Sequence, residues 1–87
     1  MKRQEIIDTV NAIIGEKADI AAEYIEPDDT LDELGVDFEK LIEASVKIED
    51  EFVINITGTE MLGLGTMKDV YDIVERKIID THGFQVY

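Results

Sequence analysis

Residues 25–52 read IEPDDTLDELGVDFEKLIEASVKIEDEF and hold the clearest structural pattern in the chain. After Asp37, residues suited to a protein core recur at the spacing of one face of an α-helix: Leu41, Ala44, Ser45, Ile48 and Phe52. Asp37 stands where its carboxylate can accept a hydrogen bond from a free N–H of the first helical turn. The stretch therefore predicts a helix that begins after Asp37 and ends at about Phe52.

Two other faces of this predicted helix have their own character. Beside the core stripe lies an apolar shoulder of Phe38, Ile42 and Val46, and beyond it an acidic flank of Glu39, Glu43 and Asp50. An aromatic residue beside other apolar residues is more often packed than free, so the favoured interpretation is that Phe38 packs against Ile42 or the loop at Leu34. The alternative is that Phe38 belongs to a docking patch for a partner.

On the N-terminal side, a first helix is predicted over residues 2–14. Its stripe consists of Ile6, Val10, Ile13 and Lys17, widened by Ile7 and Ile14. Gly15 is expected to end this helix. A long connection to Val36 follows, with a helical turn expected between residues 18 and 25. Leu31 and Leu34 are expected to anchor this connection to the core, because an unanchored loop of this length is uncommon.

On the C-terminal side, residues 53–56 are apolar and β-branched, but no second strand is present to pair with them, so a buried connection is predicted. A short third helix should span about residues 59–62. Thr66 and Asp69 have the spacing of a capping box and predict a last helix that ends near Ile79. The sum is an all-α, four-helix bundle with three longer helices and one short one. The predicted domain covers residues 1–80, and residues 81–87 are expected to form a flexible tail.

The composition restricts the classes of function. The chain has 87 residues, enough for one domain, and a formal net charge of −13 from 21 acidic and 8 basic side chains. A surface this acidic repels nucleic acid and anionic membranes, and it attracts the basic surfaces of other proteins. No cysteine is present, and no apolar run approaches the roughly 20 residues that span a bilayer. We therefore expect a soluble, cytoplasmic monomer that binds neither nucleic acid nor membrane.

No arrangement of residues predicts catalysis or a metal site. The acidic run of Asp28, Asp29, Asp32 and Glu33 lacks the glycine that a calcium-binding EF-hand loop needs at its sixth position. His82 is the single histidine, and we expect it to be solvated in the tail. No nucleophile–base pair and no pair of carboxylates around a pocket can be identified, so the chain is expected not to be an enzyme.

The order of residues in the same stretch resembles acyl carrier proteins and the related peptidyl carrier domains. That family shows an Ile-x-Pro-Asp-like segment, then Leu-x-x-Leu-Gly-x-Asp-Ser-Leu and a helix that ends in Phe. The matching residues are Ile25, Pro27, Asp28, Leu31, Leu34, Gly35, Asp37, Ile42, Glu43 and Phe52. The later residues Ile54, Asn55, Ile56, Thr66, Asp69 and Val70 also resemble family positions. The resemblance implies an acyl-carrier-like bundle that serves fatty-acid, polyketide or peptide biosynthesis.

The chain departs from the family at the residue that carries the cofactor. The family's serine, whose hydroxyl is esterified to phosphopantetheine, corresponds to Phe38, and the leucine after it corresponds to Glu39. Phenylalanine has no nucleophilic atom. The single serine, Ser45, lies on the core stripe and Thr30 lies in the loop, so neither can take its place without moving the loop. We therefore expect no cofactor, with Asp37 and Phe38 marking the place where phosphopantetheine would be attached.

The resemblance also implies a partner-binding surface on the second helix. Apolar side chains would enter a shallow pocket on a synthase, ligase or transferase, and carboxylates would meet its arginines. The corresponding residues here are Glu39, Ile42, Glu43, Val46, Glu49 and Asp50. An ordinary solvated helix face is the alternative, and the charge of the whole chain favours docking on basic surfaces of biosynthetic enzymes.

Three functions follow from these observations. The first is a carrier-like module that cannot be loaded and that docks on, or regulates, an enzyme of acyl, polyketide or peptide biosynthesis. The second is a genuine carrier whose cargo is attached differently, and the third is an acidic helical subunit that keeps only the fold. A neighbouring gene for a synthase, ligase or transferase would favour the first two. A second carrier gene with an intact Asp-Ser-Leu would favour the first over the second.

Overall fold

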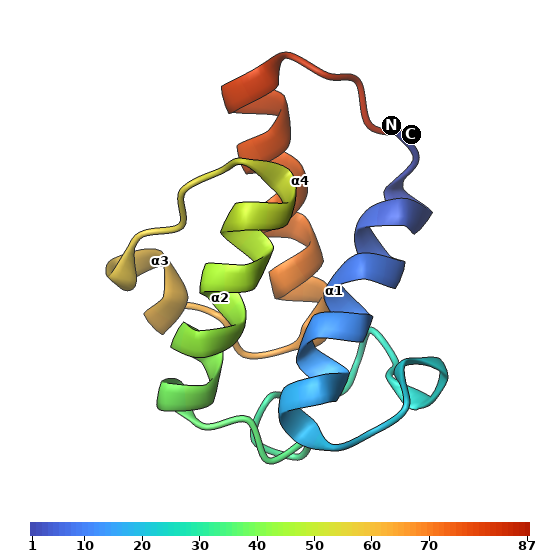
Figure 1. Ribbon diagram of the computed structural model, residues 1–87, viewed down its shortest axis with the longest axis vertical. Coiled ribbons are helices and arrows are strands. Elements are labelled where there is room, and N and C mark those ends of the chain that lie inside the picture. The colour runs from blue at the N-terminus through green and yellow to red at the C-terminus, as the bar shows by residue number, and fades with distance from the viewer.

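The computed structural model describes residues 1–87 and contains four α-helices. They are α1 (Arg3–Ala18), α2 (Phe38–Phe52), α3 (Gly58–Leu62) and α4 (Met67–His82), with a 3₁₀ turn, η1 (Ala22–Tyr24), after α1. The helices α1, α2 and α4 run alongside one another, α3 lies beside α2, and the long connection after α1 closes one end of the bundle (Figure 1). This arrangement confirms the predicted all-α bundle with a long loop between its first two helices.

The core draws on all four helices and on the connections between them. On α1 the fully buried apolar residues are Ile6, Val10 and Ile14, whereas Ile13 is only partly buried. The predicted stripe on α1 was therefore displaced by one residue at its C-terminal end. On α2 the buried residues are those of the predicted stripe, Leu41, Ala44, Ser45 and Ile48, with Phe52 partly buried at the helix end. Ile54 and Ile56 are buried too, which agrees with a buried connection between α2 and α3.

Gly15 does not end the first helix, contrary to the prediction. The helix continues to Ala18, and Asp19 then adopts the left-handed conformation that closes it. The carbonyl of Gly15 accepts the N–H of Ile20 at 2.9 Å, so the chain turns back tightly against this residue. A Cβ atom at position 15 would lie 2.5 Å from the carbonyl oxygen of Ile20. The glycine is required by this close approach and not by the end of the helix.

Two capping boxes are formed in the C-terminal half, and one of them was predicted. Thr66 and Asp69 form the predicted capping box at the start of α4. Thr57 and Glu60 form a second capping box at the start of α3, so this helix begins one residue earlier than expected. The helix α4 runs to His82, beyond the predicted end at Ile79. It ends there because Gly83, the next residue, adopts a left-handed backbone with a φ of 70°.

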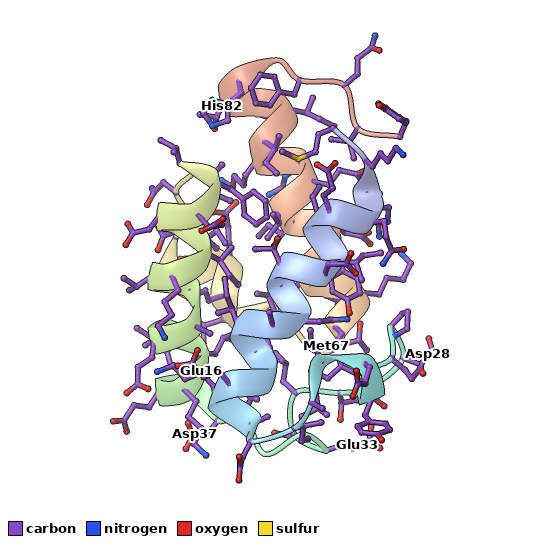
Figure 2. All side chains as sticks on the ribbon, turned by 45° about the vertical axis from the view of Figure 1, so that its right-hand side comes forward. Glu16, Asp28, Glu33, Asp37, Met67 and His82 are labelled. Carbon is purple, nitrogen blue, oxygen red and sulfur yellow. The ribbon has the colours of Figure 1, made fainter.

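His82 was expected to be solvated in the tail; it is exposed, as expected, but it belongs to α4 and its ring has partners. Its Nε2 atom lies 2.9 Å from the carbonyl oxygens of both Phe52 and Val53, at the C-terminal end of α2. Figure 2 shows His82 at the end of α4 that lies opposite to the loop carrying Asp28 and Glu33. A ring N–H in this position can satisfy carbonyl groups that a helix leaves free at its C-terminus.

The last residues return to the first ones. The N-terminal amine donates to the carbonyl of Gln85 at 2.9 Å, and the N–H of Arg3 donates to the carbonyl of Tyr87 at 2.7 Å. The two chain ends accordingly lie side by side (Figure 1). Thr81 and His82, which were assigned to the tail in the sequence analysis, belong to α4.

One polar pair is enclosed in the core. The hydroxyl of Tyr71 on α4 donates a hydrogen bond to Oδ1 of Asn11 on α1, and both side chains are buried. Burial raises the pKa of the Tyr71 hydroxyl, because the phenolate would be poorly solvated there. The pair fixes how α1 and α4 meet, since each group would lose its partner if the helices slid.

We predict that Tyr71→Phe destabilises the protein by about 1–2 kcal/mol, because the Asn11 amide oxygen is left buried without a donor. Urea unfolding followed by circular dichroism measures the loss. Tyr24→Phe is the control, since Tyr24 is exposed and its hydroxyl forms no hydrogen bond within the chain. Equal effects of the two substitutions would contradict a structural role for the buried pair.

Candidate functional site

The loop before α2 is fixed to the first turn of α4. The N–H groups of Met67 and Lys68 donate to the carbonyls of Asp29 and Pro27, at 2.9 and 3.0 Å. The N–H of Leu31 donates to the carbonyl of Gly65 at 2.9 Å. Figure 2 shows Met67 at the same end of the molecule as the loop that carries Asp28 and Glu33.

Buried side chains complete the anchoring of this loop. Leu31 is buried, as predicted, and Leu34 packs partly against the core. Val36 is buried as well, and its N–H donates to the carbonyl of Leu31 at 2.9 Å. Gly35, at φ 76°, allows the turn between them. The start of α2 is therefore held at a defined place.

Asp37 caps α2 as predicted. Its Oδ1 atom accepts the N–H of Lys40 at 2.8 Å, and its backbone is extended just before the helix. Phe38 is the first residue of α2, at the position where the family resemblance expects the attachment serine. Phe38 is 44% exposed and does not join the core cluster, so its packing against Ile42 or Leu34 stays a prediction.

The apolar shoulder is open to solvent along α2. Ile42 is 40% exposed and Val46 is 53% exposed, and both follow Phe38 at intervals of one helical turn. Each of these side chains sits beside the buried stripe without joining the core cluster. The structure therefore presents an exposed apolar stripe from the start of α2 to its middle at Val46.

The predicted partner-binding carboxylates fall into two groups. Glu39 and Asp50 are exposed and take part in none of the ion pairs of the structure. Glu43 pairs with Lys17 of α1 at 3.2 Å, with half of its side chain exposed. Glu49 accepts the N–H of Ile56 at 3.1 Å, which ties α2 to the segment before α3. Glu39 and Asp50 are thus the carboxylates left free to meet another molecule.

A second ion pair joins the same two helices. Lys47 of α2 contacts Glu16 of α1 at 2.9 Å, and its hydrogen bond and positive charge lower the pKa of the Glu16 carboxyl. In Figure 2, Glu16 on α1 and Asp37 at the start of α2 lie at the same end of these helices. Lys47, the lysine of α2 that contacts α1, is therefore engaged within the chain, whereas Lys40 takes part in no ion pair.

The hydroxyl groups nearest in sequence to position 38 are both engaged. Ser45 is 3% exposed, and its hydroxyl donates to the carbonyl of Ile42 at 2.7 Å. The hydroxyl of Thr30 donates to Glu33 at 2.8 Å and accepts the N–H of the same residue at 3.0 Å. Neither is placed as an outward-facing hydroxyl at the start of α2.

The acidic loop residues make local turns and caps. The Asp29 carboxylate accepts the N–H of Glu26 at 2.9 Å, and the Glu33 carboxylate accepts the Thr30 hydroxyl. No three side chains of the metal-ligating types come together anywhere in residues 1–87. No helix of the structure is long and apolar enough to cross a bilayer.

Glu60 ties the short helix α3 to α4. One carboxylate oxygen accepts the N–H of Thr57 at 2.9 Å, and the other meets Arg76 at 2.9 Å and Lys77 at 2.8 Å. The hydrogen bond from Lys77 and that from the Thr57 backbone lower the pKa of Glu60 from 4.5 to about 2. Sequence analysis did not single out this residue, because its partners on α4 lie more than a dozen positions away.

Comparison with known proteins gives consistent results. The sequence model of the family described as "Phosphopantetheine attachment site" matches residues 8–74. An acyl carrier protein of Thermosynechococcus vestitus is 28% identical over 79 residues, which cover 90% of this chain and 98% of that protein. One from Thermotoga maritima is 27% identical over 77 residues, which cover 87% of this chain and 95% of that protein. The crystal structure of an acyl carrier protein from T. maritima matches with a TM-score of 0.79 at 31% identity, over 90% of this chain and 92% of that chain.

The depressed pKa of Glu60 predicts a loss of stability in acid. A carboxylate of this kind stabilises the fold above its unfolded pKa near 4.5, and the contribution is lost as the pH falls towards the folded value of about 2. We expect the wild type to resist urea better than Glu60→Gln at neutral pH, with the difference shrinking through this range. Glu23→Gln, at an exposed carboxylate outside the ion pairs, should show no such dependence. A difference for Glu60→Gln that stayed constant with pH would contradict the assignment.

Proposed function

The chain belongs to the family with a phosphopantetheine attachment site and is an acyl-carrier-protein-like protein, and on this premise we propose that it docks on biosynthetic enzymes without taking the phosphopantetheine arm. The observation that carries the proposal is Phe38, an exposed aromatic residue at the start of α2. An enzyme surface that binds such carriers could still bind the apolar shoulder of α2, but it would receive no phosphopantetheine arm.

The chemistry at the start of α2 supports the proposal that the chain does not take the phosphopantetheine arm. Attachment of phosphopantetheine needs a hydroxyl oxygen that can attack the phosphorus of coenzyme A, and the ring of Phe38 offers none. Ser45 is buried and bonded to the Ile42 carbonyl, and Thr30 is bonded to Glu33. The side chains present therefore do not fit covalent attachment, and no step of acyl transfer is assigned to this chain.

The surface of α2 supports the second part of the proposal, which is docking on biosynthetic enzymes. Three exposed apolar side chains stand beside two free carboxylates, Glu39 and Asp50. Apolar area supplies affinity when it is buried against a partner, and the surrounding charge steers a basic surface towards it. Glu39 adds a carboxylate beside Phe38, where the family resemblance expects leucine, so the basic character required of the partner extends to the very start of α2.

The role that follows is occupation of a carrier's docking place. Bound there, the chain would exclude a loaded carrier from the same enzyme or hold that enzyme in a complex. As proposed, it is cytoplasmic and acts as a monomer; its formal net charge of −13, which opposes association with a second copy, supports the monomer. It contributes no catalytic group of its own.

Restoring the nucleophile tests the loss of the arm. We predict that Phe38→Ser with Glu39→Leu gains the mass of one phosphopantetheine group when incubated with coenzyme A and a broad-specificity phosphopantetheinyl transferase. Intact-protein mass spectrometry is the readout. The wild type, and Phe38→Ala with Glu39→Leu, should gain nothing, because neither has a hydroxyl at this position. Loading of the wild type would refute the proposal, and failure of the serine variant would show that the loop is not an attachment loop.

A matched pair of isoleucines tests the docking surface. In the Phe38→Ser, Glu39→Leu protein, Ile42→Ala should raise the KM of the transferase roughly fivefold, equivalent to about 1 kcal/mol of lost apolar contact. Ile79→Ala is the control, because Ile79 on α4 is 43% exposed and Ile42 is 40% exposed. The kcat of both variants should stay close to that of the parent. Equal KM values for the two variants would remove α2 from the docking surface.

A further inference from the structure

Asn11, on the side of α1 that faces η1, has a polar group that the fold leaves without a partner. The residue is 8% exposed, and its Oδ1 atom accepts the Tyr71 hydroxyl. Its Nδ2 atom carries two donor hydrogens and forms no hydrogen bond within the chain. Buried donors are paired in the great majority of cases, so an unused amide group at this depth needs an explanation.

The free amide group opens into a hollow between α1, η1 and the loop that follows η1. No side-chain nitrogen or oxygen of a buried residue is both enclosed from solvent and without a hydrogen-bond partner. Because Asn11 lines the hollow, its free N–H groups face that space. The hollow has a volume of about 570 Å³, which is typical of sites for small organic ligands. Figure 1 shows η1 and its loop beside α1.

Three carboxylates surround this hollow without a cation. Asp8 on α1, Glu23 on η1 and Glu26 in the loop line it, are exposed and take part in none of the ion pairs of the structure. No basic side chain lines it. Burial and the charges of Asp29 and Glu26 raise the pKa of the Tyr71 hydroxyl, so the negative charge of the loop is felt as far as that group. The rim therefore favours a positively charged ligand.

The wall of the hollow is partly apolar. Ile7, Ile25 and Pro27 line it, with Ile25 buried and Ile7 partly buried. A hydrocarbon group that lies against these residues is removed from water, which favours binding. The hollow thus offers three kinds of contact to one molecule: carboxylates for a cation, hydrocarbon for an apolar group, and the Asn11 amide for an oxygen acceptor.

A metal ion does not suit this rim. No three side chains of the metal-ligating types come together in residues 1–87, so the three carboxylates do not converge on one small ion. A hard cation such as calcium needs several oxygen ligands in direct contact with it. An organic cation makes no such demand, because its charge can approach one carboxylate while its other groups reach the wall and the amide.

We propose that the hollow binds a small organic ammonium compound that carries a neutral oxygen acceptor and a hydrocarbon group, as amino-acid amides and esters do. The ammonium group meets the rim carboxylates, the carbonyl oxygen accepts an N–H of Asn11, and the hydrocarbon lies against Ile7 and Ile25. A free amino acid suits the place less well, because its carboxylate would face the acidic rim. The inference goes beyond the proposed function, since no residue of α2 lines the hollow.

Leucinamide is the probe, used at about pH 6.5, where its amine, with an ordinary pKa of about 8, is protonated. Titration into nitrogen-labelled protein should shift the side-chain amide signals of Asn11 in the NMR spectrum, together with the backbone signals of residues 22–27. Two relatives of the probe test the chemistry: leucine carries a carboxylate, and isocaproamide lacks the ammonium group. Each should bind roughly fivefold more weakly or worse. Equal binding of the three compounds, or no shift at Asn11, would overturn the proposal.

The rim carboxylates are tested by Glu23→Gln with Glu26→Gln. This variant should bind leucinamide roughly threefold to tenfold more weakly, because exposed ion pairs each contribute modestly, and its affinity for isocaproamide should stay unchanged. The control is Glu51→Gln with Asp80→Asn, which removes the same charge at two exposed positions outside the hollow. An equal loss in the control would assign the attraction to the charge of the whole chain and contradict a site in the hollow.

The Asn11 donor is tested by comparing two ligands, so the result does not depend on the stability of the variant. Isoamylamine is leucinamide without its amide group, and the wild type should bind it roughly fivefold more weakly than leucinamide. Asn11→Leu is similar in size and has no donor, so the folded variant should bind the two amines equally. A preference for leucinamide that survives in Asn11→Leu would contradict the role of Asn11. Should that variant fail to fold, the Glu23 and Glu26 substitutions still decide whether the hollow is the site.

Discussion

The free N–H groups at the first turn of α4 are the constraint on which the rest of the site depends. A helix start leaves such donors without partners inside the helix, and here the carbonyls of Pro27 and Asp29 accept those of Lys68 and Met67. The connection between α1 and α2 is thereby held against a helix that follows it by some thirty residues. Because Leu31 and Val36 are buried on the same connection, the chain must arrive at Asp37 in one place and direction. The orientation of α2, and of everything displayed on it, follows from those contacts.

The distribution of charge adds a second constraint. Six of the eight basic side chains form ion pairs within the chain: Arg3, Lys17, Lys47, Lys68, Arg76 and Lys77. Most of the 21 acidic side chains remain without a cation, so the net charge of the folded chain is strongly negative. Two lysines hold α1 against α2 at the cost of masking Glu43, one of the carboxylates expected to meet a partner. The same cations cannot serve both purposes, and among the carboxylates of α2 expected to meet a partner, Glu39 and Asp50 are the exposed ones that no cation of the chain contacts.

Sequence reasoning succeeded for most features that neighbouring residues decide and failed for those decided at long range. The cap at Asp37, the buried stripe of α2 and the Thr66–Asp69 capping box all depend on residues within a few turns, and all were predicted. The pairing of Tyr71 with Asn11 and the contact of His82 with the end of α2 join residues far apart in the chain, and no periodicity reveals them. The prediction that Gly15 ends the first helix failed for a related reason. A glycine that ends a helix and a glycine that another segment approaches look alike until the fold brings Ile20 against it.

The separation between what holds α2 and what α2 displays bears on the proposed role. The anchors of the loop are backbone hydrogen bonds and the buried side chains of Leu31 and Val36, and none of them involves residue 38. The side chain at the first position of α2 projects from the surface, so replacing a serine there by phenylalanine leaves every stabilising contact of the loop in place. A chain of this family can therefore carry phenylalanine at this position without losing its fold or the exposed shoulder of α2.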